Sequence, residues 1–218
     1  MKKTEVLLLF VPFIACTSAL AQRPIDSAIY ADIKKLRGKG IETIVRFNPL
    51  GFNAPVYVSD TLIGLGIVHP FEIQFLTYTS GEHTWCRKYE DYCNENCDNV
   101  GLAISKDYET PDPAPFLWLQ ANGGAIKKEE LYPYVYRLKL NGKEHYDKLE
   151  VDHPALYLIG IYTPGEDVVK QFDGMGLLRK RPNFPVNLNY ETNHSTKLYT
   201  FYLLMEGYFS KIDKKFVF

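Results

Sequence analysis

The sequence predicts a mainly β protein, an antiparallel β-sandwich or barrel with a short N-terminal helix. Three observations predict this fold class. Runs of β-branched and aromatic residues cover most of the chain, turn residues separate these runs at short intervals, and only one stretch has a clear helical period. Such a pattern favours antiparallel strands over alternating strand and helix units.

The first 21 residues predict a secretory signal peptide. Lys2 and Lys3 precede an apolar run that ends at Ala15 and is too short to span a bilayer. The three residues that end at Ala21 match the A-x-A cleavage pattern. We therefore expect cleavage between Ala21 and Gln22.

The segment "FIAC", which ends at Cys16, supports an alternative export signal. In that alternative the chain is a bacterial lipoprotein with a lipid anchor on Cys16. Either signal exports the chain, so we expect a secreted, periplasmic or cell-surface protein. Residues 22–218 are expected to form one mostly β domain, long enough to bury a substantial core, with no transmembrane anchor.

The N-terminal helix is expected over residues 26–37. Its apolar residues recur at i, i+4 and i+7 from Ile29 to Leu36, which makes a single stripe along one face. Basic residues favour its C-terminal end, and Gly38 can take the left-handed conformation that stops a helix. We expect this segment to be the longest helix of the protein.

Strands are expected over most of the remaining chain. In the segment 71–79, Phe71, Ile73 and Phe75 alternate with other residues and so share one face. The stretch "HTWCRKY" that follows the Ser80-Gly81 turn also favours a strand. The other expected strands are 41–47, 55–67, 100–105, 116–120, 155–162, 166–172, 197–205 and 214–218.

The strongest local signal is a β-hairpin in "YVYRLKLNGKEHYDKLEV". Apolar residues alternate with polar ones from Tyr134 to Leu140, and Asn141-Gly142 follows directly. Asn-Gly readily adopts the two positive φ angles of a type I′ turn. The sequence therefore predicts two antiparallel strands joined by a two-residue turn.

The stretch from His83 to Cys97 holds three of the four cysteines. In an exported protein neighbouring thiols tend to pair, so we expect one disulfide, between Cys86 and Cys97, with Cys93 free. Pairing Cys93 with Cys97 would close a very tight loop. Two alternatives stay open, namely three free thiols or a closed zinc site in which His83 joins the three cysteines.

The sequence carries no recognisable catalytic motif. It lacks a phosphate-binding loop, a G-x-S-x-G elbow and an H-E-x-x-H pair, so we predict no catalytic residue, cofactor or metal. The 25 basic and 26 acidic residues nearly balance, which argues against a nucleic-acid partner. Asn193-His194-Ser195 is the one N-glycosylation triplet that we single out.

These observations favour a non-enzymatic protein of the cell envelope or the extracellular space. Such a mainly β chain is expected to act as a binding or structural module for a protein or glycan partner. The alternative is a secreted hydrolase that acts on glycans or peptides through carboxylates or histidines brought together by the fold. A fold class alone does not decide between them.

Overall fold

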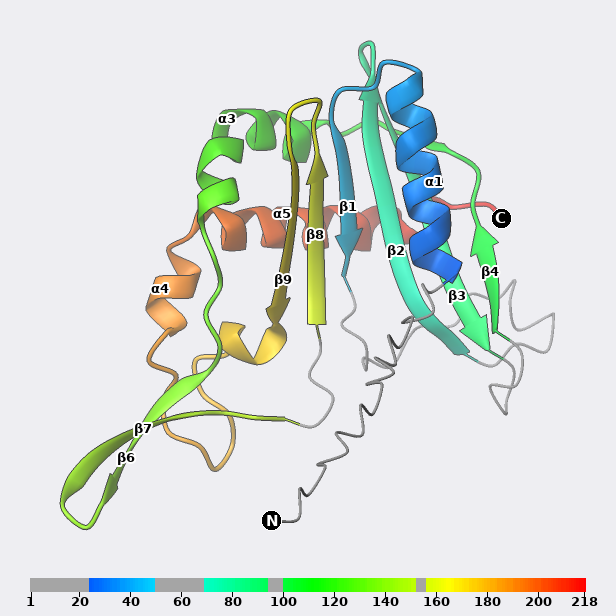
Figure 1. Cartoon of the computed structure of the whole chain (residues 1–218). Coiled ribbons are helices and arrows are strands. Elements are labelled where there is room, and N and C mark those ends of the chain that lie inside the picture. The colour runs from blue at the N-terminus through cyan, green and yellow to red at the C-terminus, as the bar shows by residue number, and fades with distance from the viewer. Residues whose placement is uncertain (1–23, 50–68, 94–99, 152–155) are drawn as a thin grey trace, which may run out of the picture.

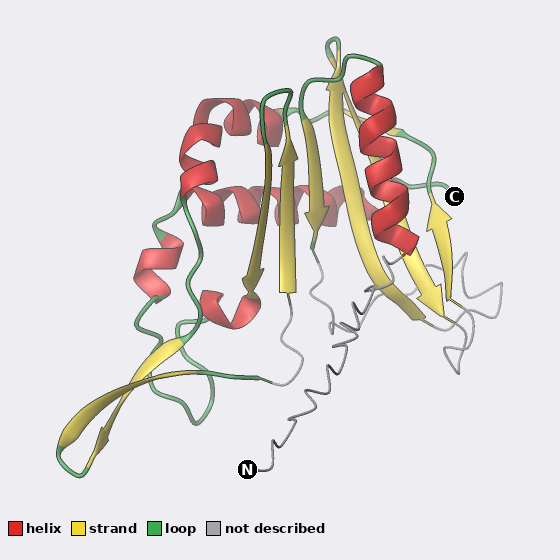
Figure 2. Ribbon diagram, in the orientation of Figure 1, coloured by secondary structure: helices red, strands yellow, loops and turns green. Residues whose placement is uncertain are grey.

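The computed structural model describes residues 24–49, 69–93, 100–151 and 156–218. Its main body is an open antiparallel sheet with helices on both faces, and a separate two-stranded hairpin projects from it (Figure 1). The mainly antiparallel β fold with a short N-terminal helix is confirmed. The sheet is not closed into a barrel, and within the described ranges the layers on its faces are helices (Figure 2).

Seven strands form the main sheet. Six of them lie side by side in the order β4-β3-β2-β1-β8-β9, and β5 pairs with β3 next to β4. Every pair is antiparallel. The strands are β1 (Ile44–Asn48), β2 (His69–Ser80), β3 (His83–Cys93), β4 (Val100–Ile104), β5 (Tyr108–Thr110), β8 (Leu156–Tyr162) and β9 (Asp167–Asp173).

Four α-helices and two short 3₁₀ helices accompany these strands in the described part of the chain. Helix α1 covers one face of the sheet, and α5 crosses the opposite face (Figures 1 and 2). The helices are α1 (Pro24–Gly38), α3 (Ala114–Lys128), η1 (Gly174–Leu177), α4 (Tyr190–His194), α5 (Lys197–Ile212) and η2 (Asp213–Lys215).

Most of the expected strands are present with small shifts at their ends. The segments 41–47, 71–79, 100–105, 155–162 and 166–172 correspond to β1, β2, β4, β8 and β9. The stretch "HTWCRKY" begins β3, which continues to Cys93. The expected strand at 55–67 lies outside the described residues.

Three expected strands are wrong. The segment 197–205 lies in α5, 116–120 lies in α3, and 214–218 forms η2 and an irregular end. In α5 the helical period is plain only over the whole element, because its buried residues recur every three or four positions. They are Leu198, Phe201, Tyr202, Met205, Tyr208, Phe209 and Ile212.

Helix α5 is also longer than α1, with 16 residues against 15, so the expectation about the longest helix is wrong. The side chain of Thr196 caps α5 by accepting a hydrogen bond from the backbone nitrogen of Tyr199 at 3.0 Å. This cap satisfies a backbone donor that the first turn of a helix would otherwise leave unpaired.

The core is divided by the sheet into two layers. On β1, Val45 and Phe47 point to α5, whereas Ile44 points to α1. Phe47 and Phe75 both stack on Phe209 of α5, with ring centroids 5.3 and 4.1 Å apart. Because both faces of the central strands are covered, their apolar runs are continuous.

The predicted hairpin is confirmed as β6 (Val135–Leu140) and β7 (Lys143–Lys148). Leu140 lies opposite Lys143, so the turn has two residues. Asn141 has a φ of 51° and Gly142 a φ of 78°, which are the positive angles that a type I′ turn requires. Residues 135–148 are called the arm below.

Candidate functional site

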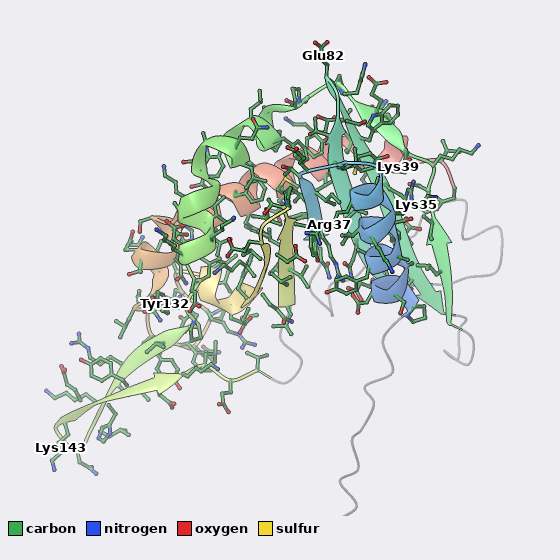
Figure 3. All side chains as sticks on the ribbon, turned by 45° about the horizontal axis from the view of Figure 1, so that its top comes forward. Lys35, Arg37, Lys39, Glu82, Tyr132 and Lys143 are labelled. Carbon is green, nitrogen blue, oxygen red and sulfur yellow. The ribbon has the colours of Figure 1, made fainter. Side chains whose placement is uncertain are left out.

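The arm projects from the main body and places Lys143 at its tip (Figure 3). It forms its own two-stranded sheet, separate from the main sheet. Every residue of β7 is exposed, and so are the last two residues of β6. β7 therefore presents side chains to solvent along its whole length, and β6 does so at Arg137 and toward the turn.

A small hydrophobic cluster anchors the base of the arm. Tyr134, Tyr136 and Leu149 are buried there, and Phe184 packs against them. The rings of Tyr136 and Phe184 meet edge to face with centroids 5.8 Å apart. Since an isolated hairpin is only marginally stable in water, this cluster is what holds the arm in one place.

Asn187 joins the base of the arm to the segment that follows η1. Its side-chain nitrogen donates to the carbonyl oxygens of Gly176 and Leu178, at 2.9 and 3.1 Å. Its side-chain oxygen accepts from the backbone nitrogen of Val135 at 3.3 Å. Only 2 % of Asn187 is exposed. These bonds keep residues 179–181, called the basic loop below, beside the arm.

Asn193 is a second buried side-chain amide near the base of the arm. Its side chain accepts from the backbone nitrogen of Tyr132 and donates to the carbonyl oxygen of the same residue, both at 2.8 Å. It also donates to the carbonyl oxygen of Gly176 at 2.9 Å. Asn193 is fully buried. The amide of the glycosylation triplet is therefore a structural group that a glycan could not reach in the folded protein.

Basic residues are concentrated on the arm and the basic loop. The two segments hold two acidic residues, Glu144 and Asp147. Arg137 and Glu144 form an exposed ion pair at 3.2 Å. The other six cations form no ion pair with any residue in the described ranges. The seven basic residues are Arg137, Lys139, Lys143, Lys148, Arg179, Lys180 and Arg181.

This basic surface was not predicted from the sequence. Arg179-Lys180-Arg181 is a visible basic triplet, but more than 30 positions separate it from the basic residues of β7. The signal that could have revealed the surface is the combination of that triplet with the basic, alternating hairpin.

A shallow groove of about 440 Å³ lies between the end of α3 and the beginning of α5. Small-molecule sites are mostly apolar, whereas this groove is lined by charged and hydroxyl-bearing residues. The carboxylate of Glu129 already accepts a hydrogen bond from the backbone nitrogen of Leu198 at 2.8 Å. The lining residues are Lys128, Glu129, Glu130, Tyr132, Thr192, Ser195 and Thr196.

A row of buried polar side chains lies on the sheet face that α1 covers. Arg46 donates from Nε to Gln74 at 2.5 Å and pairs with Asp26 of α1. Gln74 donates to Glu72 at 2.5 Å, and Asn48 donates to the same carboxylate at 2.9 Å. These hydrogen bonds offset the cost of burying the polar groups.

Glu72 is directly opposite Asp91 in the pairing of β2 with β3. Residues opposite each other in an antiparallel pair share one face of the sheet, so the two carboxylates lie on the same side. Each residue is only 2 % exposed. A pair of neighbouring buried carboxylates is the kind of arrangement that acid–base chemistry uses.

A second charged cluster, in which Lys88 and Glu90 are buried, lies on the opposite face. The Nζ atom of Lys88 is 2.5 Å from Oε1 of Glu90 and 2.7 Å from Oδ1 of Asp213. Glu90 is fully buried, and this burial raises the pKa of its carboxyl, an effect that the Lys88 charge opposes. The cluster joins β3 to the C-terminal end of α5.

Cys86 is a free thiol in the structure and is fully buried. Thr77 donates a hydrogen bond to its sulfur at 3.4 Å, and burial raises the pKa of the thiol. The strand does not end near Cys86 but runs seven residues further, which is about 23 Å, to Cys93. Cys97 lies outside the described residues, so its disulfide with Cys86 stays a prediction.

The zinc alternative is weakened by the position of His83. Its side chain is exposed and pairs with Glu109. His83 and Cys86 are three residues apart on β3 and therefore point to opposite faces of the sheet. Within the described ranges, no three His, Cys, Asp or Glu residues are arranged to hold a metal ion.

Comparisons with family models, with curated proteins and with solved structures find no significant match. In the part of the chain that the structure describes, no helix is both long enough and apolar enough to cross a bilayer. The arm, with its fixed base and its concentrated positive charge, is the best candidate for a functional surface.

Proposed function

We propose that this protein is an exported binding module of the cell envelope or the extracellular space, and that it engages a protein or glycan partner through the arm. The observation that carries this proposal is an exposed hairpin held in one place by a buried base. The outer part of the arm adds little to the core. A fixed, exposed element of this kind is suited to contacting another molecule.

The export part of the proposal rests on the signal peptide. The first test is the intact mass of the protein recovered after export. A chain that begins at Gln22 is the expected result, whereas a diacylglyceryl mass on Cys16 would identify a lipoprotein. Retention of the unprocessed chain in the cytoplasm would contradict the export proposal altogether.

The second test is site-specific photo-crosslinking in the producing cell. A photoreactive residue replaces Tyr146, which is 65 % exposed on the arm, and in a control it replaces Glu82. Glu82 is exposed at the β2–β3 turn, away from the arm (Figure 3). We expect a discrete adduct from position 146 only. Equal adducts from both positions, or none from 146, would contradict the proposal.

A hydrolase is the second candidate, because Glu72 and Asp91 are buried neighbours on one face. In this role one carboxyl would donate a proton and the other would act as base or nucleophile. The test measures hydrolysis of chromogenic glycosides and of labelled peptides by the wild type. Activity that Glu72→Gln abolishes without changing the melting temperature would support this candidate over the binding module.

A further inference from the structure

We infer that the arm and the basic loop together bind an acidic polysaccharide. This inference rests on the proposed function and names the chemistry of the partner. It is carried by the concentration of positive charge, by the row that three cations form on one face of the arm, and by an exposed tyrosine on the same face.

The charge of the protein is distributed unevenly. The arm and the basic loop hold seven basic and two acidic residues, whereas the rest of the chain holds 18 basic and 24 acidic residues. An anionic partner would therefore be attracted to this surface and repelled by much of the remaining chain. The net charge of the whole chain, −1, does not reveal this local excess of positive charge.

Three of the four cations of the arm lie in a row on one face, which also carries Glu144, whereas Lys143 lies on the other face. Arg137 and Lys139 are two residues apart on β6, so they share a face and are separated by about 7 Å. Lys148 lies opposite Val135 and extends the same face toward the base of the arm. A compact anion needs donors that converge on it, whereas this arrangement suits a polymer with repeated negative groups.

Tyr146 adds an aromatic surface to that face. It lies directly opposite Arg137 and is 65 % exposed. A tyrosine ring offers an apolar face and a hydroxyl group together, which suits the apolar C–H faces and the hydroxyls of a sugar. At the tip, Leu140 beside the Asn141-Gly142 turn is 53 % exposed, but it is a single apolar side chain, whereas a segment that inserts into a lipid interface presents a whole apolar face.

Charged residues on a hairpin edge also have an ordinary explanation. Lysines on exposed strand edges prevent pairing with other chains and so protect against aggregation. That protection depends on charge but not on its sign, because glutamate on the same edge also prevents close packing. Charge reversal therefore separates the two roles, since it keeps the protection and removes the attraction for a polyanion.

The test measures binding of the exported protein to heparin and to polygalacturonate, with neutral dextran as the negative control. The arm variant combines Lys139→Glu with Lys180→Glu. The matched control combines Lys35→Glu with Lys39→Glu, which changes the net charge equally at two exposed lysines of α1 and the turn after it (Figure 3). Melting temperatures verify that both variants are folded.

We expect the wild type to bind at least one of the two acidic polysaccharides and to release it as salt is raised. The arm variant should bind at least about tenfold more weakly, with the control within about twofold of the wild type. Equal losses in both variants, no binding to either polysaccharide, or tighter binding to phosphatidylglycerol vesicles or to DNA would overturn the inference. A cross-link from position 146 to a neutral partner would leave the proposed function intact while refuting this inference.

Discussion

The hydroxyl group of Tyr134 donates a hydrogen bond to the carbonyl oxygen of Pro185 at 2.5 Å, across 51 positions of the chain. The same hydroxyl accepts a hydrogen bond from the backbone nitrogen of Arg181 at 3.2 Å. Tyr134 is fully buried. One side chain thus joins the base of the arm to the end of the basic loop.

Tyr134→Phe is therefore expected to loosen the basic loop while leaving the main sheet folded. The variant leaves the carbonyl oxygen of Pro185 and the nitrogen of Arg181 without this partner, which costs about 1–3 kcal/mol. Trypsin should then cut after Arg179 or Lys180 faster than in the wild type; it does not cut after Arg181, because Pro182 follows. The measurement is limited proteolysis followed by mass spectrometry.

Tyr146→Phe is the matched control for that experiment, because it removes a hydroxyl group from an exposed tyrosine of the same hairpin. It should change neither the melting temperature nor the rate of cleavage in the basic loop. Similar cleavage of both variants would show that the hydroxyl of Tyr134 does not hold the loop.

Gly176→Ala is expected to destabilise the base of the arm. A Cβ atom at this position would come within 2.4 Å of the backbone carbonyl oxygen of Tyr132, so backbone would have to move. Overpacking of this kind costs about 1–3 kcal/mol. The change should appear in urea unfolding as a lower midpoint.

Gly124→Ala provides the contrast within the same protein. Gly124 lies in the interior of α3, and a Cβ atom there meets nothing within 4 Å. Alanine favours the helix over glycine, so this variant should be more stable by about 0.5–1 kcal/mol. Equal effects of the two alanines on the unfolding midpoint would contradict the packing described at Gly176.

Alkylation can determine whether Cys86 is a free thiol or part of a disulfide. In the native protein the thiol is buried and its pKa is raised, so iodoacetamide at pH 8 should leave it unmodified. After unfolding without a reductant, the free thiol of the structure should react at once. A disulfide with Cys97 would instead block the reaction until a reductant is added, and peptide mapping would then identify the pair.

Glu90 should make the stability of the protein depend on pH. Its pKa is raised above the ordinary value of 4.5, chiefly by burial, so the folded state holds the proton more tightly than the unfolded chain does. Ionisation of Glu90 therefore lowers stability as pH rises through 4.5 and the folded pKa above it. Melting temperatures measured from pH 4 to pH 8 will show this decline.

Glu90→Gln removes the titrating carboxyl group but retains the ion pair between Lys88 and Asp213, whose atoms Nζ and Oδ1 are 2.7 Å apart. The variant should lose less stability than the wild type over the same rise in pH. Parallel curves for the two proteins would show that Glu90 does not carry a raised pKa in the folded state.

Local sequence patterns predicted an element correctly where nearby residues alone determine its structure. The stripe from Ile29 to Leu36 defines α1, and Asn141-Gly142 defines the turn of the arm. The same reasoning failed for 116–120 and 197–205, where aromatic and apolar residues occur close together. A short apolar run suits a buried strand and a buried helix equally well. The length of the whole element and the residues it packs against determine which of the two forms.

The mainly β character of this protein, its N-terminal helix and the position of its hairpin turn can be predicted from the sequence, because each depends on residues within a few positions of one another. The packing of α5 on β1, the position of Glu72 opposite Asp91 and the position of the basic loop beside the arm are known only from the folded structure. These relationships join residues far apart in the chain. They depend on strand order, on register and on the burial of side chains such as Tyr134, none of which a local pattern specifies.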